Sequence, residues 1–178
     1  METQIITANP HHAPALSYLG RIAFRAAFAQ LFKKKIELEE YLDYTYSVEK
    51  IACSLKKENN VYFLALVDGL PAGFAKVKRH SLNEQLDSFS QAELQKLYVL
   101  QQFHGKGVAD ALLVAVFEFT FSIEAECLWL DTHVSNERAI RFYEKHGFKK
   151  EGTAFFTIGT QTFEYYVFAI PIQITKPC

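Results

Sequence analysis

Hydrophobic and polar residues follow two periodic patterns along this chain, and together they predict both helices and strands. Apolar side chains recur with a helical period over residues 14–31, whereas residues 61–67 and 72–77 are rich in β-branched and aromatic residues. Asp68 and Gly69 lie between those two runs, and this pair is typical of a tight hairpin turn.

The full set of expected elements places consecutive strands beside strand–helix–strand units. In chain order we expect a strand at 4–7, helices at 14–31 and 36–55 with an interruption near 45–47, strands at 61–67, 72–77 and 94–100, a helix at 108–123, a strand at 127–130, a helix at 135–146, and strands at 155–158 and 163–170. Such an order predicts an α/β chain whose mixed sheet is flanked by helices.

Three segments carry patterns that predict how they are buried or how they end. Residues 108–123 are apolar nearly all round, which predicts a helix buried on most of its circumference. Residues 127–130 lack polar alternation, which predicts a strand buried on both faces. Gly147 followed by Phe148 predicts a helix end with a left-handed glycine and a hydrophobic closing contact.

Composition limits the class of protein. A length of 178 residues predicts a single domain spanning 1–178, and 49% hydrophobic residues are enough for a sizeable core. The net charge is −1, so neither nucleic acid nor an anionic membrane is an expected partner. The three cysteines are scattered, which predicts no metal site and no disulfide framework and favours a cytoplasmic location. The first ten residues do not resemble a signal peptide.

The most informative segment covers residues 97–113. A predicted strand enters a short loop with Gly105 and Gly107, and a predicted helix follows at once. Glycines let backbone amides turn toward a ligand, and the start of a helix adds unpaired N–H groups with a partial positive charge. Together with Lys106, these features are typical of a phosphate or pyrophosphate site.

Two familiar phosphate loops do not fit this segment. A P-loop needs Ser or Thr after its lysine, and here Gly107 follows Lys106. A dinucleotide fingerprint needs a third glycine, and Asp110 occupies that position. A nucleotide-binding domain is therefore a remote alternative, and on glycine spacing alone a plain turn between strand and helix is an equal one.

The segment resembles the acyl-CoA loop of the GCN5-related N-acetyltransferase (GNAT) superfamily, which reads Q/R-x-x-G-x-G/A after the fourth strand. In the register that suits the spacing best, His104 stands at the Gln/Arg position. A register that begins at Gln102 matches every letter but shortens the loop. The preferred register implies that the loop binds the pyrophosphate of CoA through residues His104, Gly105, Lys106, Gly107, Val108 and Ala109.

A second motif about thirty residues later strengthens the resemblance. The family pattern N-x-x-A-I-x-x-Y-x-x-x-G-F is matched by Asn136, Ala139, Ile140, Tyr143, Gly147 and Phe148. The resemblance implies the GNAT fold: a mixed, mostly antiparallel central sheet, flanked by helices, whose fourth and fifth strands splay apart. Bacterial polyamine N-acetyltransferases are similar in further respects, among them an acidic second helix and a Phe-rich last hairpin.

The resemblance also implies a co-substrate and residue roles. Acetyl-CoA would lie with its pantetheine arm along Leu97, Tyr98 and Val99, and the Val99 amide would donate to the thioester carbonyl. Asn136 and Tyr143 would line the opposite wall, with the Tyr143 hydroxyl donating to the leaving sulfur as the catalytic group. No metal is expected.

The sequence offers several candidates for the general base and for the acceptor. Glu93, His133, Tyr98 and an ordered water are candidates for the base, and each side chain is also compatible with a packing or solvated role. A small primary amine is the expected acceptor, with polyamines first, because several acidic residues of the second helix could attract a polycation; these are Glu37, Glu39, Glu40, Asp43 and Glu49. A solvated helix face is the alternative for this set.

Other acceptors, acyl-CoA binding without turnover and a homodimer are further alternatives. The acceptor could instead be a protein amino terminus or lysine, or the chain could bind acyl-CoA without turnover. A homodimer could form through an apolar surface on the last hairpin, made of Phe155, Phe156, Phe163, Tyr165 and Phe168.

Overall fold

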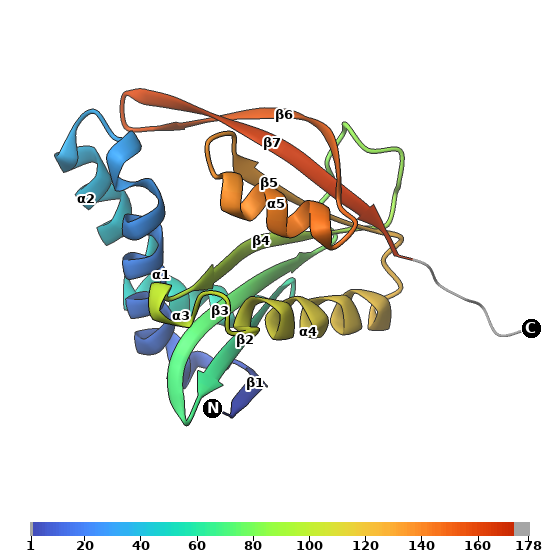
Figure 1. Cartoon of the computed structure of the whole chain (residues 1–178), viewed down its shortest axis with the longest axis horizontal. Helices are drawn as coiled ribbons and strands as arrows, with labels where there is room; N and C mark the ends of the chain where they lie inside the picture. Colours follow the sequence, from blue (N-terminus) through green and yellow to red (C-terminus); the bar gives the residue numbers. More distant parts are fainter. Residues whose placement is uncertain (1, 173–178) are drawn as a thin grey trace, which may run out of the picture.

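Seven strands form one sheet in the order β1-β2-β3-β4-β5-β7-β6 (Figure 1). The computed structural model describes residues 2–172. Its strands are β1 (Thr3–Thr7), β2 (Asn60–Val67), β3 (Leu70–Arg79), β4 (Gln91–Val99), β5 (Cys127–His133), β6 (Lys149–Ile158) and β7 (Gln161–Pro171). Its α-helices are α1 (Ala13–Phe28), α2 (Lys35–Thr45), α3 (Val48–Leu55), α4 (Val108–Ser122) and α5 (Glu137–Lys145).

The helices divide between the two faces of the sheet and create two cores. One core lies under α4 and α5, where Leu112, Leu113 and Val116 pack on Leu128 and Leu130 of β5. The other lies under α1, α2 and α3 and is rich in aromatic rings, including Phe24 of α1 and Tyr46 after α2; it also contains Phe28, Phe74 and Phe163. The expected mixed sheet flanked by helices is confirmed.

The turn signals read from the sequence are confirmed. Asp68 and Gly69 have φ angles of +48° and +80° and join β2 to β3, as a tight hairpin requires. Gly147 has a φ of +87°, and the amide of the buried Phe148 reaches back 3.1 Å to the carbonyl of Tyr143. This closure ends α5 and fixes the direction of β6.

The parallel pair β4–β5 is short, and this opens the sheet. Only Gln91, Ala92 and Glu93 pair with β5, opposite Cys127, Leu128 and Trp129, whereas the other neighbouring strands pair antiparallel. Beyond Glu93 the two strands diverge. The expected splay of these strands is therefore confirmed.

A bulge between β3 and β4 changes which face of the sheet each side chain meets. Lys76 pairs with Lys96 and Val77 pairs with Leu94, so Gln95 has no opposite residue. Leu94 consequently packs toward α4, whereas Lys96 and Tyr98 face α1. The extra residue explains the mixed polarity of this strand in the sequence.

Two predictions on burial were wrong. Helix α4 is not buried on most of its circumference, because the sheet covers only one of its faces and leaves Val114 and Phe121 about half exposed, at 55% and 48%. The last hairpin does not present all its aromatic residues either. Phe163 and Phe168 point into the cores and only Phe155 and Phe156 are exposed, so an apolar surface here is small and a homodimer stays a prediction.

Some boundaries also differ from the sequence prediction. β6 begins at Lys149 and not near residue 155, because antiparallel pairing with the long β7 starts at Ala169 and continues through polar positions. The interruption expected near 45–47 is confirmed: it separates α2 from α3, and Ser47 caps α3 by accepting a hydrogen bond from the amide of Lys50. Within residues 2–172, no helix is long and apolar enough to cross a membrane.

Candidate active site

A cleft of about 950 Å³ opens where β4 and β5 diverge and continues toward α1 and the β6–β7 hairpin. It brings together nearly all the cofactor-binding residues predicted from the sequence; these are Leu97, Tyr98, Val99, His104, Gly105, Gly107, Val108, Ala109, Asn136 and Tyr143. Lys106 is not among its lining residues, because its exposed side chain lies 5.7 Å from the Phe103 ring and its amide donates to the Phe103 carbonyl.

The start of α4 has the backbone geometry of an anion site. Gly105 and Gly107 have φ angles of +71° and +77°, and a Cβ atom on either would meet no protein atom within 4 Å. The first hydrogen bond of the helix runs from the Ala111 amide to the Gly107 carbonyl, and no side chain caps this end. The preceding amides of the first turn are therefore free to bind a ligand.

The backbone of β4 also faces the gap. The Leu100 amide donates to the Ala72 carbonyl of β3 at 2.9 Å, and alternation then directs the amides of Leu97 and Val99 away from β3, toward β5. With no paired strand there, these groups can bind an extended ligand. The backbone amide of Tyr98 does not face this gap, because it points toward β3, and the Tyr98 side chain faces α1.

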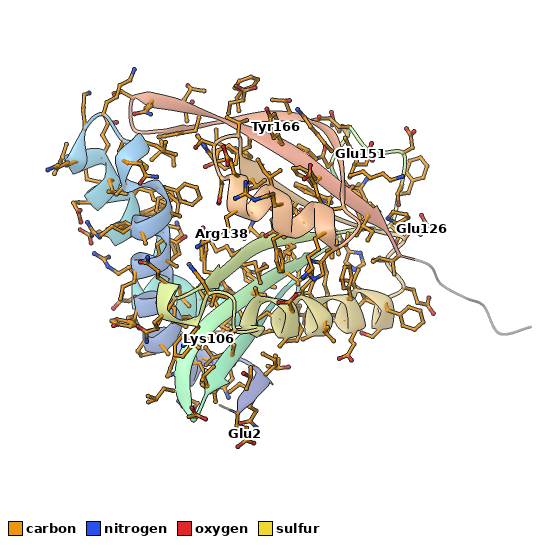
Figure 2. All side chains as sticks on the ribbon, viewed as in Figure 1. Glu2, Lys106, Glu126, Arg138, Glu151 and Tyr166 are labelled. Atoms are coloured by element: carbon orange, nitrogen blue, oxygen red, sulfur yellow. The ribbon has the colours of Figure 1, made fainter. Side chains whose placement is uncertain are left out.

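His104 does not present its ring as a free ligand. Its Nε2 lies 2.9 Å from the Val99 carbonyl oxygen, and its Nδ1 accepts a hydrogen bond from the Arg138 guanidinium. The ring therefore ties the loop before α4 to α5. Figure 2 shows Arg138 near the start of α5, facing the loop that carries Lys106. Arg138 brings a positive charge to the cleft that the sequence analysis did not assign.

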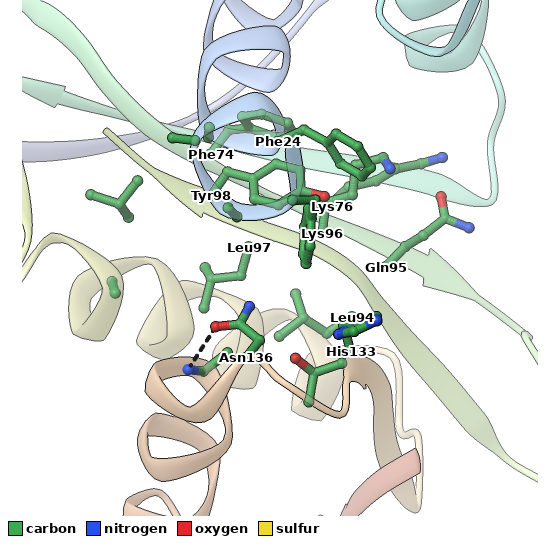
Figure 3. Close-up of a pocket in the computed structure, with 18 of the residues that line it drawn as sticks. Phe24, Phe74, Lys76, Leu94, Gln95, Lys96, Leu97, Tyr98, His133 and Asn136 are labelled. Carbon is green, nitrogen blue, oxygen red and sulfur yellow. Dashed lines mark hydrogen bonds between the residues drawn. The ribbon is translucent and has the colours of Figure 1, made fainter. Parts of the chain in front are cut away.

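Asn136 and Tyr143 form the α5 wall of the cleft. The Asn136 side chain caps α5 by accepting a hydrogen bond from the Ala139 amide at 3.3 Å (Figure 3). Tyr143 is 7% exposed, and its hydroxyl has no hydrogen-bond partner among residues 2–172. Burial, and next the negative charge of Asp131, raise the Tyr143 pKa, so the hydroxyl stays protonated and available as a donor.

Comparisons with known proteins decide the family. The model of the acetyltransferase (GNAT) family matches residues 21–148. The chain belongs to this family. An uncharacterized N-acetyltransferase of Mycobacterium tuberculosis is 32% identical over 130 residues, which cover 73% of this chain and 79% of the relative.

Solved structures agree with the GNAT fold. The PaiA N-acetyltransferase of Thermoplasma acidophilum, solved with coenzyme A, has a TM-score of 0.78 and 20% identity over 96% of this chain and 99% of its own. The ribosomal-protein-S18-alanine N-acetyltransferase of Escherichia coli has a TM-score of 0.70 and 19% identity over 98% and 97%. At such identities the likeness shows the fold alone. The uncapped helix start and the splayed strands of this GNAT chain fit CoA.

Two carboxylates, Glu93 and Asp131, line the cleft near the point where β4 and β5 diverge. Glu93 is buried and accepts hydrogen bonds from the Ser81 hydroxyl at 2.7 Å and from Gln95 at 3.4 Å. Asp131 lies on β5 beyond the last β4–β5 pair, and burial together with the charge of Glu93 raises its pKa to about 6. A carboxylate with this pKa is ionised near neutral pH and can still accept a proton.

His133 and Tyr98 are poorly suited to act as a base. The Nδ1 of His133 accepts the Ser135 amide proton at 3.2 Å, so in the neutral ring Nε2 carries the proton, and burial lowers the His133 pKa. Tyr98 lies against the Phe74 ring and shares a hydrogen bond with Tyr46, and burial raises its pKa. Both side chains line the cleft, where they can orient a ligand.

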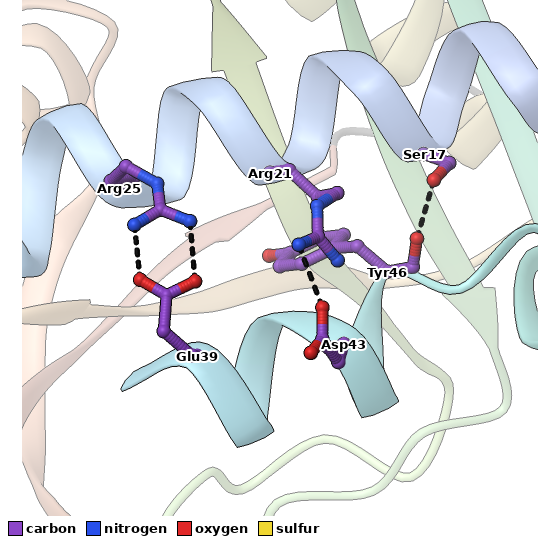
Figure 4. Close-up of polar contacts among 6 residues, drawn as sticks. All are labelled: Ser17, Arg21, Arg25, Glu39, Asp43 and Tyr46. Carbon is purple, nitrogen blue, oxygen red and sulfur yellow. Dashed lines mark hydrogen bonds and ion pairs between the residues drawn. The ribbon is translucent and has the colours of Figure 1, made fainter. Parts of the chain in front are cut away.

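The acidic residues of α2 do not line the cleft. Glu39 forms a bidentate ion pair with Arg25, and Asp43 lies 2.7 Å from Arg21 (Figure 4). Glu37 accepts hydrogen bonds from Lys34 and from Thr160 at the tip of the β6–β7 hairpin. These contacts hold α2 to α1 and to the hairpin, and they leave no acidic channel along α2.

The tip of the hairpin fastens onto the segment between α1 and α2. The Gln161 side chain accepts from the Lys33 amide at 3.0 Å and donates to the Leu31 carbonyl at 2.7 Å. A Cβ on Gly159 would meet the Glu37 carboxyl group at 2.6 Å, so the two segments are in close contact. We call these contacts of Gly159, Thr160 and Gln161 the hairpin latch. It joins the tip of the hairpin to residues 31–37.

The sequence analysis missed several charged side chains that line the cleft, among them Lys76, Lys96, Asp131 and Arg138. None stands in a motif that the resemblance uses. Lys96 lies in a predicted strand and Asp131 directly follows another. They reach the cleft only because β4 has a bulge and because β4 and β5 diverge. Among the described residues, no cluster of three or more His, Cys, Asp or Glu side chains could hold a metal ion.

Proposed function

We propose that this GNAT chain transfers the acetyl group of acetyl-CoA to a primary amine of a small molecule, by direct attack within a ternary complex. The observation that carries the proposal is the position of three kinds of group around the gap between β4 and β5. The free amides of Leu97 and Val99, the uncapped start of α4 and the Tyr143 hydroxyl all face one continuous cleft.

The residues fit the chemical steps of acyl transfer. The amine nitrogen attacks the thioester carbon, so a C–N bond forms and the C–S bond breaks. The Val99 amide supports the oxygen that gains negative charge, a contribution of about 3 kcal/mol in related reactions. The Tyr143 hydroxyl donates a hydrogen bond to the departing thiolate, which later takes up a proton as free CoA.

We assign the role of proton acceptor to Asp131. An alkyl ammonium has an ordinary pKa of about 10.4, so it must lose a proton before its nitrogen can attack. Asp131 of β5 lines the cleft together with Tyr41, Tyr143 and Tyr165, and its charge adds to the effect of burial in raising the pKa of Tyr143 and Tyr165. The proton that the amine loses passes to this carboxylate and then to solvent or to the thiolate.

A polyamine is a weaker choice of acceptor than the sequence indicated. Its recognition would depend on the acidic residues of α2, and these pair with α1 and the hairpin latch instead of lining the cleft. A cytoplasmic location stays a prediction from the scattered cysteines, of which Cys53 and Cys127 are free thiols.

The test is release of free thiol from acetyl-CoA with a panel of amines, amino acids and peptides. We expect acetylation of a small amine and, in Tyr143→Phe, a loss of kcat of roughly a hundredfold with unchanged CoA affinity by calorimetry. Tyr18→Phe, an exposed tyrosine outside the cleft, is the matched control. Tight CoA binding without turnover on any acceptor would indicate a binding module, and turnover on peptides alone would indicate a protein acetyltransferase.

A further inference from the structure

Two lysines face each other in the wall of the cleft on the α1 side. Lys76 of β3 and Lys96 of β4 are directly paired residues of neighbouring strands, and both line the cleft. Figure 3 shows them beside Tyr98 and close to Phe24 of α1. Like charges directly opposite each other in a sheet are unfavourable, so this pair calls for a counter-charge.

The described residues do not provide a close counter-charge for these two ammonium groups. Neither Nζ has a carboxylate oxygen within 4.0 Å among residues 2–172. Lys96 makes one long hydrogen bond, 3.4 Å, to the Tyr46 hydroxyl, and Lys76 lies 5.5 Å from the Tyr62 ring. Their surroundings are therefore aromatic, with hydroxyl groups but without an ion pair.

The environment has an electrostatic effect on both groups. Burial lowers the pKa of Lys96 to about 8, against the opposing attraction of Asp131 and Glu93. Burial and the charge of Lys96 lower the pKa of Lys76 to about 8 as well. At pH 7 both ammonium groups are mostly charged, and an anion placed between them would relieve the repulsion and replace lost hydration.

The charges of the cleft thus have a direction. Asp131 stands on β5 on the side of Tyr143, whereas Lys76 and Lys96 stand on the wall formed by β3 and β4, under α1. Glu93, the other carboxylate in this part of the cleft, is at the paired end of β4, where it accepts hydrogen bonds from Ser81 and Gln95. A molecule with an amine at one end and an anion at the other matches this direction. A polycation does not, because it would have to place an ammonium group beside the two lysines.

We propose that the acceptor is a small amino acid, with its nitrogen at Asp131 and its carboxylate bound by Lys76 and Lys96. The inference rests on the proposed function and names the substrate class of the same site. The aromatic side chains around the lysines, Phe24, Tyr46 and Tyr98, then surround the carbon skeleton of the acceptor.

The test uses matched acceptors at pH 7 in the thiol-release assay. Leucine, leucinamide and isoamylamine share one skeleton, as do alanine, alaninamide and ethylamine, and putrescine serves as a dication. We expect kcat/KM for each amino acid to exceed that for its amide by roughly tenfold or more, about 1.4 kcal/mol per factor of ten. An amide or putrescine used as well as the amino acids would overturn the inference while leaving the proposed function intact.

Variants of the two lysines supply the second readout. Lys96→Met and Lys76→Met should each reduce the preference for the carboxylate, and Lys96→Arg should restore most of it. Lys78 is on β3, like Lys76, but does not line the cleft, so Lys78→Met should keep the wild-type preference. Thermal melts of all variants check folding.

Calorimetry separates this inference from the proposed function. The amino acids are titrated into the protein–CoA complex, so that binding is measured without turnover. Binding of leucine that is lost in Lys96→Met supports the acceptor class even if no acetylation occurs, which would contradict only the transferase proposal. No binding of any amino acid by the wild-type complex, or equal binding by Lys96→Met, would overturn the inference.

Discussion

Gly107 shows how one residue can decide whether a turn becomes a binding site. Its φ of +77° lies where side chains are disfavoured, and a Cβ there would meet only open space. The protein itself therefore has no need of that space, whereas a ligand that approaches the backbone does.

We expect Gly107→Val to abolish CoA affinity and to lower the free energy of unfolding by about 1–3 kcal/mol through backbone strain. Calorimetry with CoA and thermal melts measure the two effects. Gly69→Val is the matched control, because Gly69 has a φ of +80° and an equally open Cβ position in the β2–β3 turn, away from the cleft. Equal CoA affinity in both variants would contradict the loop assignment.

Replacing Asp131 should change stability and activity in opposite directions. Its pKa is about 6 in the folded chain against an ordinary 3.8, so the folded state retains a proton that the unfolded state loses between those values. Stability therefore falls as pH rises from about 4 to 6, and the penalty is complete above 6. We expect Asp131→Asn to reduce turnover but to raise the free energy of unfolding at pH 7.5 by on the order of 1–2 kcal/mol.

Measurements at two pH values check the sign of this effect. At pH 4 the gain from Asp131→Asn should largely disappear, because the wild-type carboxyl group is then protonated in the folded state and loses its proton only partly on unfolding. Denaturant unfolding at pH 4 and 7.5, with kcat at pH 7.5, covers both parts. A variant that is less stable than wild type at pH 7.5 and equally active would show that Asp131 has a structural role.

At the scale of the elements, the hairpin latch connects β6–β7 to α2. The hairpin carries Phe156, Ile158 and Tyr165, which line the cleft away from the loop before α4, so under the proposed function we expect its position to affect the acceptor more than CoA. The latch could not be predicted from the sequence. Its partners are more than 120 residues apart and consist of ordinary polar side chains and one glycine.

We expect Gly159→Ala to disturb the latch, because its new methyl group would meet the Glu37 carboxyl group at 2.6 Å. The overpacking should lower the free energy of unfolding by about 1–3 kcal/mol, and the KM for the amine should rise while the KM for acetyl-CoA stays unchanged. Steady-state kinetics with each substrate varied in turn measure this split. Gly69→Ala is the control for the left-handed backbone; a similar change in that variant would exclude the latch as the cause.

Some features of the fold could be predicted from the sequence and others could not, and the reasons are physical. Local signals such as Asp68-Gly69 and Gly147-Phe148 depend on backbone conformation within a few residues, and the structure agrees with them. The exposure of Val114 and Phe121 depends on how much of α4 the sheet covers, which no local pattern contains. The direction of Lys96 depends on a bulge formed with another strand.

At the scale of the whole molecule, the sheet consists of two parts joined by few paired strand residues. Strands β1–β4 form one part and β5, β7 and β6 the other, and only three residue pairs connect them through β4 and β5. Other connections cross the cleft: the hairpin latch, the His104–Arg138 contact, and Asp110 on α4, which lies 3.2 Å from His146 after α5.

We expect CoA to stabilise the molecule as a further connection between the two parts. At a free concentration one hundred times its Kd, it should add about 2.7 kcal/mol to the free energy of unfolding. Hydrogen exchange should show slower exchange of the Leu97 and Val99 amides, with little change in β1, which has no residue in the lining of the cleft. Uniform protection over all strands, or none at Leu97 and Val99, would contradict the assigned path of the pantetheine arm.

The unpaired Gln95 has a consequence for the whole of β4. Side chains of a strand alternate with a period of two, so one extra residue shifts the phase of every later position by half a period. If Gln95 were kept but paired regularly, without the bulge, Lys96 and Tyr98 would share the face of Leu94 and point into the hydrocarbon beneath α4, while Leu97 and Val99 would turn toward α1. The unpaired position in the β4 register thus determines which face of this part of the sheet is charged and which is apolar.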